Sequence, residues 1–141
     1  MKRIIAIAAC LLASLAAAGT ASAQDHAAKA NIPFGFYVGN NWLPAGTYTL
    51  TSDAGNPNEI FIHNGEGKVS LLSLGYPDDN QPAGTHKLVF KKYGDQYFLH
   101  EVLCSTCRMN IAFSESKREK KAEKLEATNE APRDVYLALL K

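Results

Sequence analysis

The sequence predicts an all-β protein: a β-sandwich or partly open barrel of about seven or eight mostly antiparallel strands, with one charged C-terminal helix. Three observations lead to this prediction. Apolar residues recur with period two over residues 30–113. Gly, Pro, Asn and Asp divide that region into short segments, as turns do in all-β proteins. After Ser114 the composition changes abruptly to helix-forming residues rich in Lys and Glu.

The first 23 residues are typical of a cleavable export signal. Lys2 and Arg3 precede an apolar run over residues 4–18, and the small residues Ala21 and Ala23 suit the cleavage site. The segment before Cys10 resembles the site at which lipoproteins are cut and acylated, but its apolar run is shorter than an export signal needs. We therefore expect cleavage after Ala23, loss of Cys10 with the leader, and a periplasmic or extracellular protein.

The predicted mature chain, residues 24–141, is nearly neutral. The full chain has a formal net charge of +1, and removing Lys2 and Arg3 lowers it by two, to −1. General nucleic-acid binding requires a basic surface, so we expect no nucleic-acid partner. The mature chain has the length of a single domain and no second apolar stretch long enough to span a membrane. We expect one β-rich domain with no transmembrane segment.

The first predicted strand is marked by the alternation of Ile32, Phe34, Phe36 and Val38, with Pro33 at a sheet edge. Asn40 and Asn41 predict a turn. A second tight turn follows over residues 43–46, since proline fixes its backbone and glycine accepts positive φ. Residues 47–51 then predict a strand whose Tyr48 and Leu50 point inward.

Five further strands complete the predicted β-region. Residues 59–63 and 68–74 form one hairpin, joined through residues 64–67. Residues 76–85 have little to bury and predict an exposed loop. Residues 87–92 and 96–103 form the clearest hairpin, and residues 108–113 continue the sheet.

A helix is predicted over about residues 115–128 and a final strand over about residues 134–140. Ser114 or Ser116 caps the helix. Its only apolar interior residues are Ala122 and Leu125, so we expect the helix to lie largely in solvent. In the final strand, three apolar side chains point inward: Val135, Leu137 and Leu139.

The predicted helix also carries an excess of positive charge. Between residues 117 and 124, five basic residues outnumber Glu119 and Glu123 by three; they are Lys117, Arg118, Lys120, Lys121 and Lys124. Such a segment suits contact with an anionic lipid, glycan or protein. The alternative is a solvated helix that binds nothing, and the lack of large apolar residues opposite the charges argues against membrane insertion.

Cys104 and Cys107 form the one motif with chemical content. In an oxidising compartment, two cysteines separated by two residues predict a disulfide in a turn. A thioredoxin-type redox site requires a helix N-terminus after the strand, and covalent haem attachment requires His where Arg108 stands. A zinc site requires two more ligands. A structural disulfide is the favoured interpretation.

The histidines His26, His63, His86 and His100 show neither metal-ligand spacing nor a triad arrangement. His100 and Glu101 are adjacent on a predicted strand, where alternation places neighbouring side chains on opposite faces. The sequence contains no nucleophile-elbow or phosphate-loop motif and no convincing acid/base pair of carboxylates. We therefore predict no catalytic residues, no metal ligands and no cofactor.

Several stretches of the chain resemble a family of small exported acidobacterial proteins of uncharacterised function. They are Asn-Ile-Pro-Phe-Gly-Phe-Tyr-Val-Gly at 31–39, Leu-Pro-Ala-Gly-Thr-Tyr at 43–48, Leu-Val-Phe at 88–90 and Tyr-Gly-Asp-Gln-Tyr-Phe-Leu at 93–99. The start of the charged helix, Ser-Lys-Arg-Glu at 116–119, is similar too. The resemblance implies a β-rich fold and export, but no activity and no site residues.

These observations together predict an exported, non-catalytic binding or structural component of the envelope or secretome. Its partner is expected to be a protein or an envelope component. Two alternatives remain: a thiol-disulfide redox protein using Cys104 and Cys107, and a metal-binding protein using histidines and cysteines.

Overall fold

The computed structural model describes residues 26–53, 55–65, 70–78, 84–127 and 131–140. The predicted leader with Cys10, the start of the predicted strand at Lys68, half of the predicted loop 76–85 and Thr128 lie outside these residues. Within them, the chain forms two curved sheets and one helix, α2 (Lys117–Glu126).

The first sheet is antiparallel and has four strands. Their spatial order is β1 (His26–Ile32), β4 (Gly46–Ser52), β5 (Glu59–Asn64) and β6 (Ser70–Leu74). Tyr48 and Leu50 of β4 and Ile60 and Ile62 of β5 are buried, so one face of this sheet covers the core. The inward direction predicted for Tyr48 and Leu50 is confirmed.

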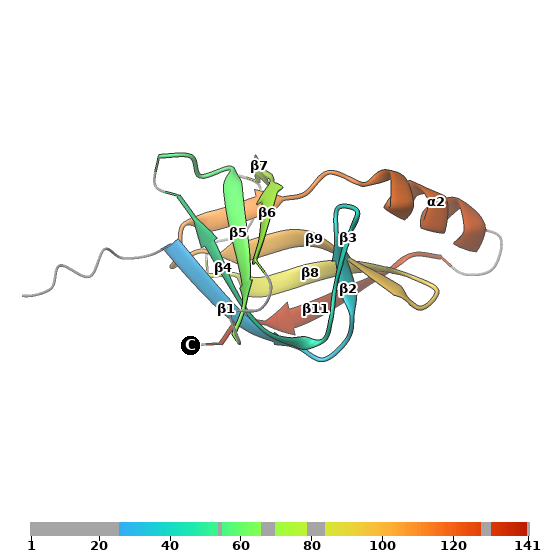
Figure 1. Ribbon diagram of the computed structural model, residues 1–141, viewed down its shortest axis with the longest axis horizontal. Helices are drawn as coiled ribbons and strands as arrows, with labels where there is room; N and C mark the ends of the chain where they lie inside the picture. The colour runs from blue at the N-terminus through green and yellow to red at the C-terminus, as the bar shows by residue number, and fades with distance from the viewer. Residues whose placement is uncertain (1–25, 54, 66–69, 79–83, 128–130, 141) are drawn as a thin grey trace, which may run out of the picture.

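The second sheet has seven strands, and its central hairpin is the predicted one. The order is β11 (Arg133–Ala138), β8 (His86–Tyr93), β9 (Gln96–Cys104), β10 (Met109–Ala112) and β7 (Tyr76–Pro77). A short hairpin of β2 (Phe36–Val38) and β3 (Asn41–Leu43) joins the sheet near the start of β9, where Tyr37 pairs with Phe98 in parallel. Figure 1 shows this hairpin beside β8 and β9, with α2 at the same end of the molecule.

The two sheets are linked along one side. The backbone N–H of Leu140, just after β11, donates to the carbonyl of Lys29 on β1 at 2.7 Å. Val135, Leu137 and Leu139 pack against the shared core, as predicted. The result is a half-barrel of curled sheets (Figure 1), which confirms the predicted all-β fold with a C-terminal helix. No helix among the described residues is long and apolar enough to cross a membrane.

The predicted tight turn before β4 is fastened by Tyr48. Its hydroxyl donates to the carbonyl of Pro44 at 2.7 Å, while the ring is fully buried against Phe36. Gly46 pairs with Ile32, which fixes the register of β4 on β1. In the Leu-Pro-Ala-Gly-Thr-Tyr turn, the hydroxyl of the last residue, Tyr48, thus supplies a hydrogen-bond donor to the carbonyl of the second residue, Pro44.

A β-bulge at His100 reverses the alternation of β9. Val89 pairs with Glu101, but the next residue, Phe90, pairs with Leu99, which leaves His100 as the extra residue. Before the bulge, Leu99 faces the core; after it, Val102 and Cys104 do. His100 and Glu101 consequently lie on the same outer face, with His100 Nε2 3.8 Å from Glu101 Oε1. The prediction that they occupy opposite faces was wrong, because it assumed an unbroken strand.

The first predicted strand is in fact two. β1 ends at Ile32, and the chain changes sheets before β2 begins at Phe36. Pro33 lacks the N–H that a continued ladder requires, and Gly35 lies directly beneath the ring of Trp42. β1 begins at His26, earlier than predicted, because its buried positions Ala28 and Ala30 give only a weak apolar signal.

Two turn predictions also change. The turn predicted at Asn40 and Asn41 falls one residue earlier: Gly39 takes a positive φ of 61°, and Asn41 already begins β3. Tyr76 and Pro77, predicted as loop, pair with Ala112 and Ile111 as β7.

Replacing Tyr48 with Phe should lower the free energy of unfolding by about 1–2 kcal/mol, because the partly buried carbonyl of Pro44 loses its donor. Denaturant unfolding measures the change. Tyr136→Phe is the matched control: that hydroxyl is exposed and donates to Asp134 at 3.3 Å, so its loss should have a much smaller effect. Equal losses for both variants would contradict the role given to Tyr48.

Candidate functional site

Three contacts fix the start of helix α2 and its packing on the second sheet. Ser116, one of the two predicted caps, accepts a hydrogen bond from the backbone N–H of Glu119 at 3.1 Å. Just before the helix, Glu115 forms an ion pair with Lys91 of β8 at 3.1 Å. Ala122 packs with Tyr93 and Phe98 on the outer face of the second sheet. Helix α2 is therefore held along the β8–β9 hairpin.

The side of α2 that faces the sheet differs from the prediction. Leu125 was expected to form the apolar stripe with Ala122, but 63% of it is exposed. Glu119 takes the inward position instead and is only 4% exposed. At the end of the helix, the carboxylate of Glu126 packs against Gly94. A Cβ on Gly94 would come within 2.8 Å of this carboxylate. Packing thus turns two acidic residues of α2 toward the hairpin.

Burial raises the pKa of Glu119, and the negative charge of Glu115 raises it further, although Lys91 opposes this. One carboxylate oxygen, Oε1, is buried without a hydrogen-bond partner among the described residues. The environment therefore holds the proton of this carboxyl more tightly than water does.

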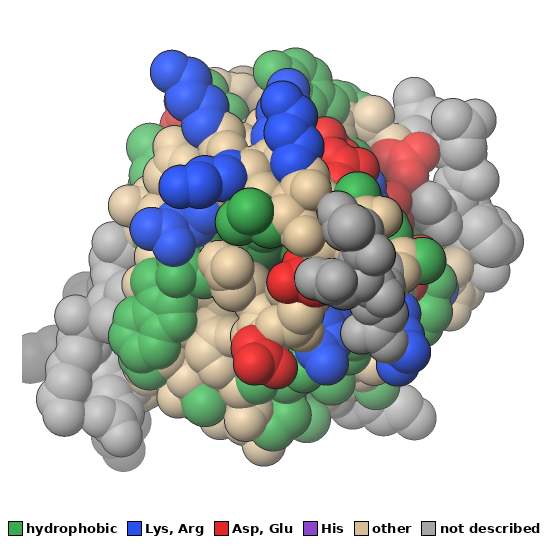
Figure 2. Space-filling view, turned by 90° about the vertical axis from the view of Figure 1, so that its right-hand side faces the viewer, with side chains coloured by type: hydrophobic (Ala, Val, Ile, Leu, Met, Phe, Trp, Pro, Cys, Tyr) green, Lys and Arg blue, Asp and Glu red, His purple; other side chains and the backbone are tan. Residues whose placement is uncertain are grey.

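The basic side chains of α2 lie at the surface of the molecule. Four lysines of the helix are exposed, and no acidic side chain within the described ranges pairs with them; they are Lys117, Lys120, Lys121 and Lys124. Figure 2 looks at this end of the molecule and shows Lys and Arg side chains gathered at its upper left. Charge on the helix is thus partly separated: Glu119 and Glu126 turn toward the hairpin, while the lysines and Glu123 are exposed.

A groove of about 430 Å³ runs between α2 and the start of β9. Lys117, Arg118 and Lys121 line it, together with Gln96, Ala122 and Leu125. Of the five basic residues singled out from the sequence, the structure brings these three together in one groove. Lys120 and Lys124 lie outside its lining.

Arg118 is fixed by an aromatic stack. Its guanidinium lies 4.6 Å from the ring centre of Tyr37 and donates a 3.0 Å hydrogen bond to the Tyr37 hydroxyl. On its sheet side, Tyr37 stacks on Phe98 with ring centres 5.1 Å apart. The stack aligns one residue from α2, one from β2 and one from β9.

Trp42 was not identified from the sequence as a functional residue. It lies on β3 opposite Tyr37 in the hairpin ladder, and 58% of it is exposed. Directly opposed residues of an antiparallel pair project to the same face, so Trp42 borders the stack that holds Arg118. A single exposed tryptophan in a short polar segment carries no periodic signal that sequence reasoning detects.

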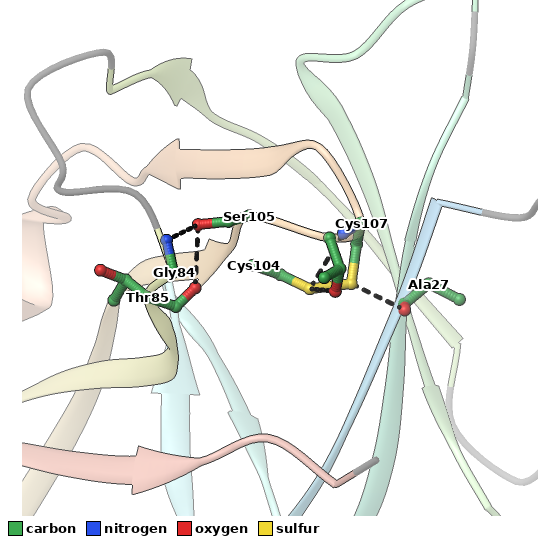
Figure 3. The surroundings of a disulfide bond; sticks show 7 residues. Ala27, Gly84, Thr85, Cys104, Ser105 and Cys107 are labelled. Atoms are coloured by element: carbon green, nitrogen blue, oxygen red, sulfur yellow. Dashed lines mark hydrogen bonds between the residues drawn. A yellow bond between two sulfur atoms is a disulfide. The ribbon is translucent and has the colours of Figure 1, made fainter.

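The predicted disulfide between Cys104 and Cys107 is present (Figure 3). It follows the C-terminal end of β9, whereas the groove beside α2 lies at the start of that strand. Cys104, the last residue of β9, is only 2% exposed because the bulge at His100 turns it into the core. Cys107 is half-buried in the following turn, before Arg108 with its positive φ of 52°. The disulfide therefore closes the turn that leads from β9 to β10.

The turn is anchored on two sides (Figure 3). The sulfur of Cys107 lies 3.1 Å from the carbonyl oxygen of Ala27 on β1; a disulfide sulfur carries no hydrogen, so this is a sulfur–oxygen contact. On the other side, the Ser105 hydroxyl accepts from the N–H of Gly84 at 3.1 Å and donates to the carbonyl of Thr85 at 3.3 Å. These contacts tie β9 to β1 and to the entry of β8, which fits a structural role.

A cleft of about 390 Å³ opens beside the disulfide. Its lining is largely apolar and consists of Ala27, Ala28, His86, Cys104, Thr106, Cys107, Leu139 and Leu140. Within the cleft, the backbone N–H of Cys107 donates to the Cys104 sulfur at 3.3 Å. The half-buried Cys107 is thus the sulfur more open to an external thiol.

The histidines are dispersed. His63 stacks on Phe61, His86 borders the cleft, and His100 occupies the bulge; the side chain of His26 lies outside what the structure describes. Burial lowers the pKa of His100, and Lys91 lowers it further. Among the described residues, no three His, Cys, Asp or Glu side chains come close enough to hold a metal ion.

Comparison with known proteins found no matching family model, no matching curated protein and no matching solved structure. The resemblance to an exported acidobacterial family therefore stays a prediction. What the fold and the geometry define is a β-rich half-barrel with a disulfide at one end and a basic helix and groove at the other.

Glu119→Gln should stabilise the protein at pH 7 and flatten the pH dependence of its stability. In the unfolded chain the carboxyl has its ordinary pKa of 4.5, whereas the folded protein holds the proton to higher pH. Above pH 4.5 the unfolded chain therefore binds fewer protons than the folded protein. The free energy of unfolding falls as the pH rises, until the pH passes the pKa of Glu119 in the folded state. Denaturant unfolding between pH 4 and 7 measures this fall.

The control for Glu119→Gln is Glu123→Gln, which neutralises an exposed acid on the same helix. Its difference from the wild type should stay nearly constant with pH. If Glu119→Gln runs parallel to the wild type across the range, the buried carboxyl does not carry the pH dependence.

A structural disulfide at Cys104 and Cys107 should have a reduction potential below about −300 mV. Equilibration of the mature protein in dithiol buffers, followed by a thiol count, measures it. Cys104→Ser/Cys107→Ser gives the thiol-free baseline. A potential near about −200 mV, within the range of thiol-disulfide oxidoreductases, would contradict a structural role.

Proposed function

We propose that the protein is an exported, non-catalytic binding component of the envelope or secretome, and that it contacts an anionic partner through α2. The leader-like segment at residues 1–23 supports export. The charge separation on α2 supports the contact: Glu119 is buried and its pKa is raised, while Lys117, Arg118 and Lys121 line one groove.

This charge separation is the observation that carries the proposal. A solvated helix gains nothing from turning a carboxyl such as that of Glu119 inward, since burying a carboxyl costs stability. Here the helix accepts that cost at Glu119 and presents lysines on its other side. Such an arrangement strengthens attraction to anions and guides their approach.

Thiol-disulfide exchange at Cys104 and Cys107 is the second candidate function. The observation that favours it is the asymmetry of the pair: Cys107 is half-buried at the cleft, and the N–H of Cys107 contacts the buried Cys104 sulfur, where it stabilises a departing thiolate. The anchoring of the turn to β1 and β8 weighs against it. The reduction potential described above decides between the two roles.

Lys117→Glu/Lys121→Glu should weaken binding of the mature protein to dextran sulfate, a general polyanion. A basic residue near an anionic surface contributes about 1 kcal/mol, so the two substitutions should lower affinity at least roughly thirtyfold. Salt elution from dextran sulfate beads and calorimetric titration both measure the change.

The matched control is Lys29→Glu/Lys87→Glu, which makes the same change in net charge on β1 and on β8, away from the groove. It should elute near the wild type. If both double variants lose affinity equally, net charge alone governs binding and the proposed use of α2 is refuted.

A further inference from the structure

Trp42 has the features of a binding platform. It is exposed, and its indole ring packs against the backbone of Gly35: a Cβ there would come within 3.0 Å of the ring. A large aromatic side chain held against the backbone loses little conformational freedom on binding a ligand.

The platform borders the basic groove. Trp42 is opposite Tyr37, and Tyr37 holds Arg118, which lines the groove with Lys117 and Lys121. In Figure 2, apolar side chains lie at the left of this face, just below the gathered Lys and Arg side chains. One continuous surface thus offers an aromatic face, a guanidinium, two ammonium groups and the amide of Gln96.

We propose that this surface binds an anionic polysaccharide, with a sugar ring on Trp42 and acidic groups of the chain in the groove. The face of an indole is electron-rich, so it attracts the slightly positive C–H groups on the face of a sugar ring. The guanidinium of Arg118 matches the planar geometry of a carboxylate. The amide of Gln96 supplies both a donor and an acceptor for sugar hydroxyls.

The combination of Trp42 with the basic groove favours an anionic polysaccharide over other anionic ligands. An acidic peptide would use the lysines but would leave the indole face without a ring to stack on it. An anionic membrane would require apolar side chains to enter the lipid, and beside the lysines the helix exposes only Leu125. The polysaccharide uses the aromatic and the charged parts together. This inference rests on the proposed function, because it names the partner class of the same site.

The experiment is calorimetric titration of the mature protein with four probes: polygalacturonate, neutral dextran, polyglutamate, and vesicles containing phosphatidylglycerol. We expect binding to polygalacturonate, weakened by salt, and no binding to dextran. Trp42→Ala should weaken polygalacturonate binding about tenfold, in line with the loss of one aromatic contact. Trp42→Phe, which keeps a flat ring, should retain most of the affinity.

Two controls accompany the variants. Tyr76→Ala removes another exposed ring, on β7, and should leave binding unchanged. Circular dichroism of Trp42→Ala verifies that the sheets are intact; if they are not, Trp42→Phe and the four-probe comparison carry the test.

Some outcomes separate this inference from the proposed function. If polyglutamate or vesicles bind as well as polygalacturonate, and Trp42→Ala changes nothing while Lys117→Glu/Lys121→Glu abolishes binding, then the polysaccharide is refuted and the anionic contact stands. If none of the anionic probes binds in a way that depends on Lys117 and Lys121, both are refuted.

Discussion

The arrangement of the α2 end depends on one stack of side chains: Phe98 of β9, Tyr37 of β2 and Arg118 of α2. Three elements distant in sequence meet there, and Tyr37 occupies the middle position. Its ring packs on the sheet, its hydroxyl accepts from Arg118, and its ladder partner is Trp42. The same contacts therefore set the direction of the helix and the groove between α2 and β9, and they place Arg118 beside the hairpin that carries Trp42.

The bulge at His100 makes the two ends of the second sheet chemically different. Because the alternation of β9 reverses there, Phe98 points outward and supports α2, while Cys104 points inward and forms the disulfide in the core. An unbroken strand with Phe98 outward would place Cys104 on the outer face as well. One extra residue thus separates a disulfide-closed end from an end that presents cations and an aromatic ring.

Local patterns predicted the parts of the fold that depend on alternation or capping. The inward residues Tyr48 and Leu50, the hairpin of β8 and β9, the Ser116 cap and the Cys104–Cys107 disulfide are all where the sequence placed them. Features that depend on tertiary contacts were missed. Burial of Glu119 in place of Leu125, the bulge at His100 and the support of Trp42 by Gly35 each require a partner that no local pattern identifies.

Trp42 is the only tryptophan of the chain, so its fluorescence reports directly on the surface argued to bind the polysaccharide. The most direct test of the account is a titration of the mature protein with oligogalacturonate while Trp42 emission is recorded. The account predicts a saturable change in emission that high salt reverses and that Lys117→Glu/Lys121→Glu greatly reduces. An emission spectrum that stays constant while calorimetry detects binding would contradict the account, because the sugar would then bind away from Trp42.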